Sequence, residues 1–97
     1  MQIDAVRDAL DVRVGQTFRD GDAARLEEAV AALGPFSRVT IDFAAARECE
    51  DAAVVRLARM LLGLSKGEVS VRGLTLHHWK LLTYLQIHRD DFKRRAS

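Results

Sequence analysis

The segment from Ser37 to Leu64 constrains the fold more than any other, because it joins one buried strand to the longest apolar-faced helix of the chain. Val39, Ile41 and Phe43 alternate with polar residues, which predicts a strand. The seven residues that follow show no helical periodicity and predict a turn. After the turn, apolar residues recur at the i, i+3, i+4, i+7 spacing of one helix face, at Val54, Leu57, Ala58 and Leu61. We expect every other element to cover this unit.

Asp51 stands where the predicted helix should begin, and we expect it to be the N-cap. Its carboxylate would accept hydrogen bonds from free N–H groups of the first turn and lie at the positive end of the helix dipole. Gly21 and Asp22 have a similar structural interpretation, because they mark the start of an earlier helix.

Composition limits the number of domains and the class of partner. The 97 residues, 48% of them hydrophobic, are enough for one small core and leave no room for a second. Fifteen basic and fourteen acidic residues give a net charge of +1, which argues against a nucleic-acid binder. No apolar run approaches the ~20 residues of a membrane helix. Without a signal-peptide pattern, and with a single cysteine, the sequence predicts a cytoplasmic protein with no disulfide and no membrane insertion.

The remaining elements complete an α/β pattern over residues 1–97 as one domain. Met1–Val6 and Leu10–Val14 should form an antiparallel hairpin, because their link is too short for a parallel crossover. The later alternation of strands and helices requires parallel pairing. We therefore predict a mixed, mostly parallel sheet of about four or five strands with three or four helices packed on it. The elements expected after the hairpin are a helix from Gly21-Asp22 to Leu33 closed by a left-handed Gly34, a strand over 38–43, a helix over 51–64, a strand over 68–72 and a helix from Thr75, its N-cap, to about Gln86.

Loops at the carboxyl ends of parallel strands usually carry function in such sheets. Here those loops are Gly15–Asp22, Ala44–Glu50 and Gly73–Thr75. Residues 88–97 form a charged, basic tail that should add little to the core. Within this tail, the sequence at Asp91-Phe92 is compatible with either a last strand or a helical turn.

Several features of the order of elements are shared with one known family. They are Gly21-Asp22 before the first helix, the run Val39–Phe43 and the run Gly67–Thr75 before the last helix. Together they resemble a STAS domain, the domain of anti-sigma-factor antagonists and of the cytoplasmic part of sulphate transporters. The resemblance covers about residues 10–87 and rests on a pattern rather than on a rare signature. It implies a non-enzymatic protein-interaction module, without a cofactor, that acts in bacterial partner switching and transcription regulation.

The family's signature lies at the turn into the second helix: an acidic residue, a serine or threonine that a partner kinase phosphorylates, a small residue, glycine and leucine. Here it matches either residues 50–54 or residues 51–55. The second register would bury Arg59, and burying an unpaired guanidinium costs several kcal/mol. In the preferred first register Glu50 is the family's acid, Asp51 its phospho-acceptor position and Ala53 its glycine. In either register the acceptor position has no hydroxyl, so a serine kinase cannot phosphorylate it.

The resemblance implies docking on a protein partner through the 44–51 loop and the helix that follows. That partner would be an anti-sigma kinase-like protein, or a transport ATPase if the chain is the STAS subunit of a lipid-transport ATP-binding cassette complex. The alternative function is that of a small-ligand or nucleotide sensor. The sequence is also compatible with a homodimer. Asp51 has two interpretations, a helix cap or a permanent mimic of phosphoserine. The implied partner-binding residues are Gly21, Asp22, Glu50, Asp51, Ala52, Ala53 and Arg56.

Other candidate chemistry is weaker, and the sequence predicts no catalytic residue and no metal site. The carboxylates around Cys49 should raise the pKa of its thiol, and no base is tied to it. His77 and His78 are adjacent, so they point about 100° apart on a helix, and His88 would lie roughly 16 Å further along. The three histidines therefore cannot share one zinc ion held at ~2 Å. We interpret them as solvent-facing.

Overall fold

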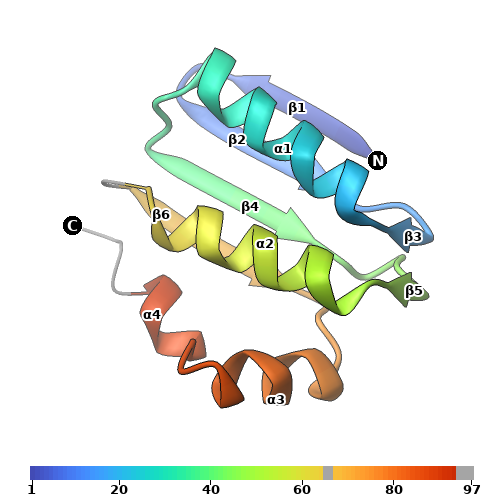
Figure 1. The fold of residues 1–97 in the computed structure, drawn as a ribbon. Coiled ribbons are helices and arrows are strands. Elements are labelled where there is room, and N and C mark those ends of the chain that lie inside the picture. Colours follow the sequence, from blue (N-terminus) through green and yellow to red (C-terminus); the bar gives the residue numbers. More distant parts are fainter. Residues whose placement is uncertain (65–66, 94–97) are drawn as a thin grey trace.

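The computed structural model describes residues 1–64 and 67–93, and it places a four-stranded sheet behind a layer of helices (Figure 1). Its strands, in spatial order, are β1 Gln2–Val6, β2 Ala9–Arg13, β4 Arg38–Asp42 and β6 Glu68–Arg72. β1 and β2 form the predicted antiparallel hairpin, and β2, β4 and β6 pair in parallel. The predicted α/β fold with a mixed, mostly parallel sheet is confirmed.

The strands bury one face of the sheet only. Their register aligns Leu10 with Val39 and Val39 with Val69, and these three side chains are buried toward the helices. The neighbouring row points the opposite way: Asp11 and Ser70 are exposed, and Thr40 between them is half-buried. Alternation along each strand therefore separates a hydrophobic layer from a polar face.

Two helices cover the buried face of the sheet (Figure 1). α1 spans Asp20–Leu33 and α2 spans Asp51–Leu62, and the two pack against each other. Arg59 is exposed on α2. The buried stripe of α2 contains the predicted residues and one more: Ala53, Val54, Leu57, Ala58 and Leu61.

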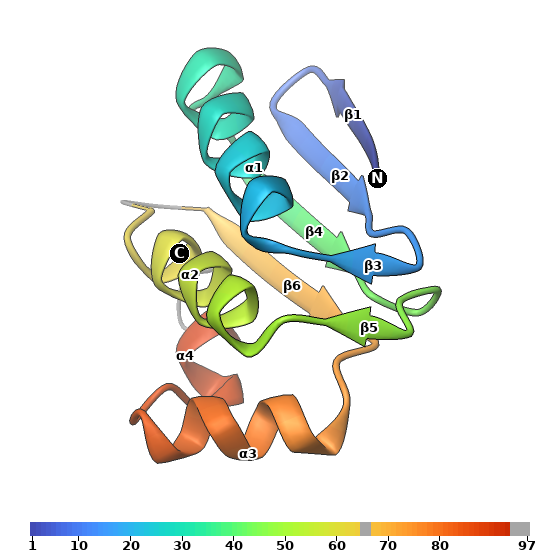
Figure 2. The same ribbon diagram turned by 45° about the vertical axis from the view of Figure 1, so that its right-hand side comes forward.

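The last two helices lie next to β6 and α2, at the edge of the sheet (Figure 2). α3 spans Leu76–Tyr84 and α4 spans Arg89–Lys93. Phe92 of α4 is only 4% exposed and meets Trp79 edge to face, with ring centroids 6.1 Å apart. The tail thus contains a helical turn and contributes to the core, contrary to expectation, because one aromatic side chain supplies much apolar area. The part of the tail from residue 94 onward lies outside the described residues.

Several predicted helix ends need correction. Thr75 is the N-cap of α3, as predicted, and its side chain accepts a hydrogen bond from the His78 N–H at 3.3 Å. The N-cap of α2 is Glu50, so Asp51 is already helical. The helix α1 begins at Asp20, before the predicted Gly21-Asp22. Gly34 is extended, with φ of −73°, and is not left-handed. Of the helices in residues 1–64 and 67–93, none is both long and apolar enough to cross a membrane.

Candidate functional site

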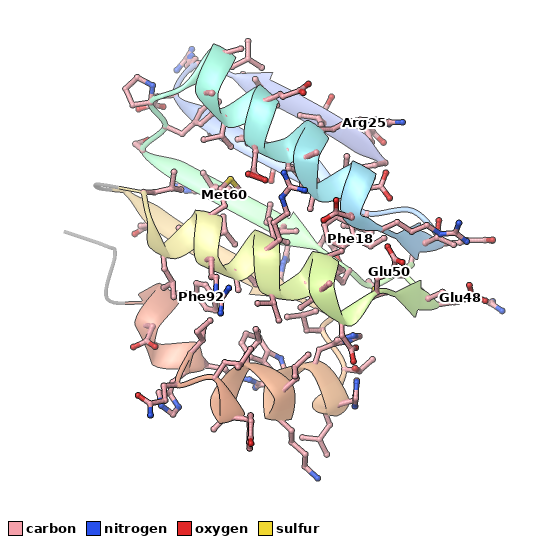
Figure 3. All side chains as sticks on the ribbon, in the orientation of Figure 1. Phe18, Arg25, Glu48, Glu50, Met60 and Phe92 are labelled. Carbon is pink, nitrogen blue, oxygen red and sulfur yellow. The ribbon has the colours of Figure 1, made fainter. Side chains whose placement is uncertain are left out.

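A small second sheet joins two of the loops that the sequence singled out. Its strands are β3 Thr17–Phe18, within the 15–22 loop, and β5 Glu48–Cys49, within the 44–50 loop. They pair in parallel, and the Glu50 N–H donates to the Phe18 carbonyl at 2.9 Å. Phe18, labelled in Figure 3, also packs edge to face on Phe43, with ring centroids 5.2 Å apart. This contact anchors both loops to the core.

Polar contacts tie the start of α1 to α2. The Asp20 N–H donates to Glu50 Oε1 at 3.0 Å, and Arg56 Nη1 donates to Asp20 Oδ2 at 2.9 Å. Arg56 Nε donates to a carboxylate oxygen of Glu27. The hydrogen bonds that Arg56 donates to Asp20 and, to a lesser extent, to Glu27 raise the pKa of its guanidinium above the already high usual value. These contacts tie the predicted binding residues Glu50 and Arg56 to α1 through Asp20 and Glu27, which the sequence did not predict for the binding surface.

The third loop is held against the second by a glycine. Gly73 has φ of +80°, and a Cβ atom there would lie 2.6 Å from the Ala44 nitrogen. Only a glycine combines this left-handed conformation with so close a backbone approach. The turn after β6 therefore sets the first turn of α3 beside the first turn of α2.

The Asp51 side chain faces α3 instead of capping its own helix. Its Oδ1 atom lies 3.1 Å from His77 Nε2 and 3.3 Å from His78 Nε2. His77 is exposed, as expected, but His78 is buried, so its interpretation as solvent-facing was wrong. The first turn of α3 packs toward α2, and His78 lies on its inner side beside Trp79.

All three loops contribute to one cleft at this end of the molecule, with a volume of about 540 Å³. Its charged groups are two arginines and three carboxylates, of which Glu48 and Glu50 are visible in Figure 3. The prediction that functional groups gather at the carboxyl ends of the strands is consistent with this arrangement. The residues that line the cleft are Arg19, Arg47, Glu48, Cys49, Glu50, Asp51, Thr75, His77 and His78.

The predicted partner-binding residues differ in how far a partner could reach them. Gly21 and Ala52 are exposed, as are Glu50 and Asp51. Asp22 and Arg56 are half-buried, and the Asp22 carboxylate accepts a hydrogen bond from the Arg19 N–H at 2.9 Å, which stabilises the start of α1. Ala53 is completely buried, so it packs in the core and cannot itself touch a partner.

The environment of Cys49 does not favour the thiolate form that a nucleophilic cysteine needs. Burial raises the pKa of its thiol, which is the direction expected from the sequence, although the expected cause was the surrounding carboxylates. The thiol therefore carries less thiolate at neutral pH than an exposed cysteine would.

No protein-family model matches the chain, and no curated protein matches it. The resemblance to STAS domains therefore stays a prediction.

The cluster of Asp51, His77 and His78 was missed from the sequence, although a signal was present. Both helices were predicted to start at the same edge of the sheet, so their first turns had to be neighbours.

Proposed function

We propose that this chain is a non-enzymatic protein-interaction module that docks on a partner through the starts of α1 and α2. The observation that carries the proposal is the connected surface formed there by Gly21, Glu50 and Ala52, which are exposed. The contact between the Asp20 N–H and Glu50 joins the two helix starts across thirty positions of sequence.

The ordering of this surface supports a docking role. Arg56 of α2 donates hydrogen bonds to Asp20 and Glu27 of α1, and so links the two helices. The pairing of β3 with β5 holds together the 15–22 and 44–50 loops, which lead into these helices. A surface that is already ordered loses little conformational freedom when a partner binds, so more of the contact energy appears as affinity. This preorganisation is what a binding surface needs and what a solvated loop lacks.

The resemblance to STAS domains suggests the class of partner, an anti-sigma kinase-like protein or a transport ATPase. The turn carries permanent carboxylates at Glu48, Glu50 and Asp51, all of them exposed. Electrostatic complementarity governs the choice of partner and the association rate, so the docking surface of that partner should be basic or neutral. With no hydroxyl at positions 51 and 52, the module acts without a phosphorylation switch.

Site-specific crosslinking tests the proposed surface. A photoactivatable benzophenone amino acid replaces Ala52 in the full chain, and Ser70, exposed on the polar face of the sheet, serves as the matched control position. After irradiation of native cells, the Ala52 variant should crosslink to an ATPase of the kinase-like or transport class, and the Ser70 variant should not. Equal crosslinking from both positions, or from Ser70 alone, would contradict this docking surface.

The captured partner then allows a quantitative check. Ala52→Arg places a bulky cation in the centre of the surface and should weaken binding at least about ten-fold, or ~1.4 kcal/mol. Ser70→Arg adds the same side chain elsewhere and should leave the affinity unchanged. Unaltered binding by Ala52→Arg in a calorimetric titration would exclude the starts of α1 and α2 as the interface.

A further inference from the structure

His78 combines burial with an unsatisfied ring nitrogen. Its side chain is only 8% exposed, and within the described residues Nε2 has no hydrogen-bond partner. Asp51 Oδ1 is 3.3 Å away, but it lies outside the directions in which an Nε2–H group could donate to it. A simple ion pair between His78 and Asp51 would therefore leave a buried polar group unpaired, and such groups in proteins call for an explanation.

The distances around Asp51 match those between ligands of one metal ion. Ligand atoms held at about 2.0–2.1 Å in a tetrahedral zinc site lie about 3.3 Å from one another. Asp51 Oδ1 is 3.1 Å from His77 Nε2 and 3.3 Å from His78 Nε2, and all three ligand atoms lie within 4.8 Å of each other. A small side-chain rotation of the exposed His77 would bring its Nε2 atom to the ligand–ligand distance of about 3.3 Å from His78 Nε2.

Thr75 orients the buried imidazole from the other side. Its Oγ1 atom lies 2.9 Å from His78 Nδ1. A proton on Nδ1 donates to this oxygen and leaves the Nε2 lone pair free for a metal ion, which would lie off the line that joins Nε2 to Asp51 Oδ1. Histidine ligands of metals are commonly oriented in this way, through a hydrogen bond made by their second ring nitrogen.

We propose that Asp51, His77 and His78 bind one divalent transition-metal ion of the zinc class. Two imidazole nitrogens and one carboxylate oxygen are ligands that zinc accepts, and three protein ligands leave a fourth position for water or a partner's side chain. The site joins the first turn of α2 to the first turn of α3. Its existence does not depend on the docking function proposed above.

Two features oppose a cation at this site: the helix dipoles and the guanidinium groups of Arg19 and Arg47, which line the same cleft. The positive ends of the α2 and α3 dipoles point toward the site, each equivalent to about half a charge. Asp51 supplies a full negative charge as a ligand, and Glu48 and Glu50 line the same cleft. The three carboxylates offset the two guanidinium groups and the two helix termini, so the cleft carries little net charge.

Isothermal titration calorimetry with zinc chloride on the chelator-treated full chain tests the site. We expect one zinc ion per chain with micromolar or tighter affinity. Even the loss of an outer hydrogen-bond partner lowers metal affinity about 10–100-fold, so His77→Ala and Asp51→Asn, which each remove a ligand, should weaken binding at least about ten-fold. Both residues are exposed, so the variants should fold. His88→Ala removes an exposed histidine outside the cluster and should bind zinc like the unaltered chain.

Long-range ¹H–¹⁵N correlation spectra of the imidazoles identify the ligands without any substitution. Zinc should shift the signals of His77 and His78, including the buried ring, and leave those of His88 in place. The proposal would be overturned by an absence of binding at millimolar zinc, by equal affinity of His77→Ala and the unaltered chain, or by shifts confined to His88.

Discussion

Cys49 lies one residue before the N-cap of α2, where a helix dipole alone would favour a thiolate. Burial outweighs that effect and raises the pKa of the thiol, so the thiolate fraction at neutral pH is small. Iodoacetamide should therefore alkylate the folded chain at pH 7 more slowly than it alkylates free cysteine, and the rate should rise as the pH is raised. Mass spectrometry of timed samples measures this rate.

A peptide of residues 44–54 is the matched control for Cys49, because it keeps the acidic neighbours and lacks the fold. It should react faster than the folded protein. Equal rates would mean that the neighbouring charges, and not burial, protect the thiol.

At the scale of single residues, sequence reasoning located Asp51 at the start of a helix but not the contacts of its side chain. The approximate start of a helix is a local property, which the neighbouring periodicity predicts, although the predicted cap was one residue off. The contact with His77 spans 26 positions and depends on how two helices pack, which no local pattern encodes. The prediction for His78 was wrong for the same reason, since the order of two adjacent helical residues does not indicate which of them faces a neighbouring element.

At the scale of elements, the buried stripe of α2 predicts a strong contrast between neighbouring positions. Leu57 is 3% exposed within the core, so Leu57→Ala should lower the free energy of unfolding by ~2–5 kcal/mol. Arg59→Ala on the exposed side of the same helix should change it by less than about 0.5 kcal/mol. Arg56 would be a poor control because it contacts two carboxylates. Urea denaturation followed by circular dichroism measures both variants.

Comparable losses at Leu57 and Arg59 would show that α2 is rotated relative to the sheet. In that case the position of Asp51 beside α3 would also fail, since both residues are fixed by the same helix.

The longer elements could be predicted from the sequence because each carries a period of its own. β6 and the cap of α3 match their predictions, and the cap of α2 lies at Glu50, one residue before the predicted Asp51. The strands β3 and β5 were missed, because two residues are too few to show alternation. They exist because two loops meet, which is a property of the assembled fold.

At the scale of the whole molecule, the last helical turn should be part of the cooperative unit. Phe92 is buried against Trp79, and Phe92→Ala should lower the free energy of unfolding by ~3–5 kcal/mol. Tyr84→Ala removes an aromatic ring that is 85% exposed and should have little effect. Chemical denaturation of the two variants provides the comparison, and equal stability of Phe92→Ala and Tyr84→Ala would show that α4 does not dock.

The order of the main sheet also bears on aggregation. A strand at the edge of a sheet offers unpaired N–H and C=O groups to other chains, and such edges are where fibres grow. The β6 edge lies beside α4, while at the opposite edge Asp4 of β1 stands directly across from Asp11 of β2. A second copy that paired its own β1 with this strand symmetrically about Asp4 would set the two Asp4 carboxylates against each other. The fold thus discourages growth of the sheet by helical cover at one edge and by charge at the other.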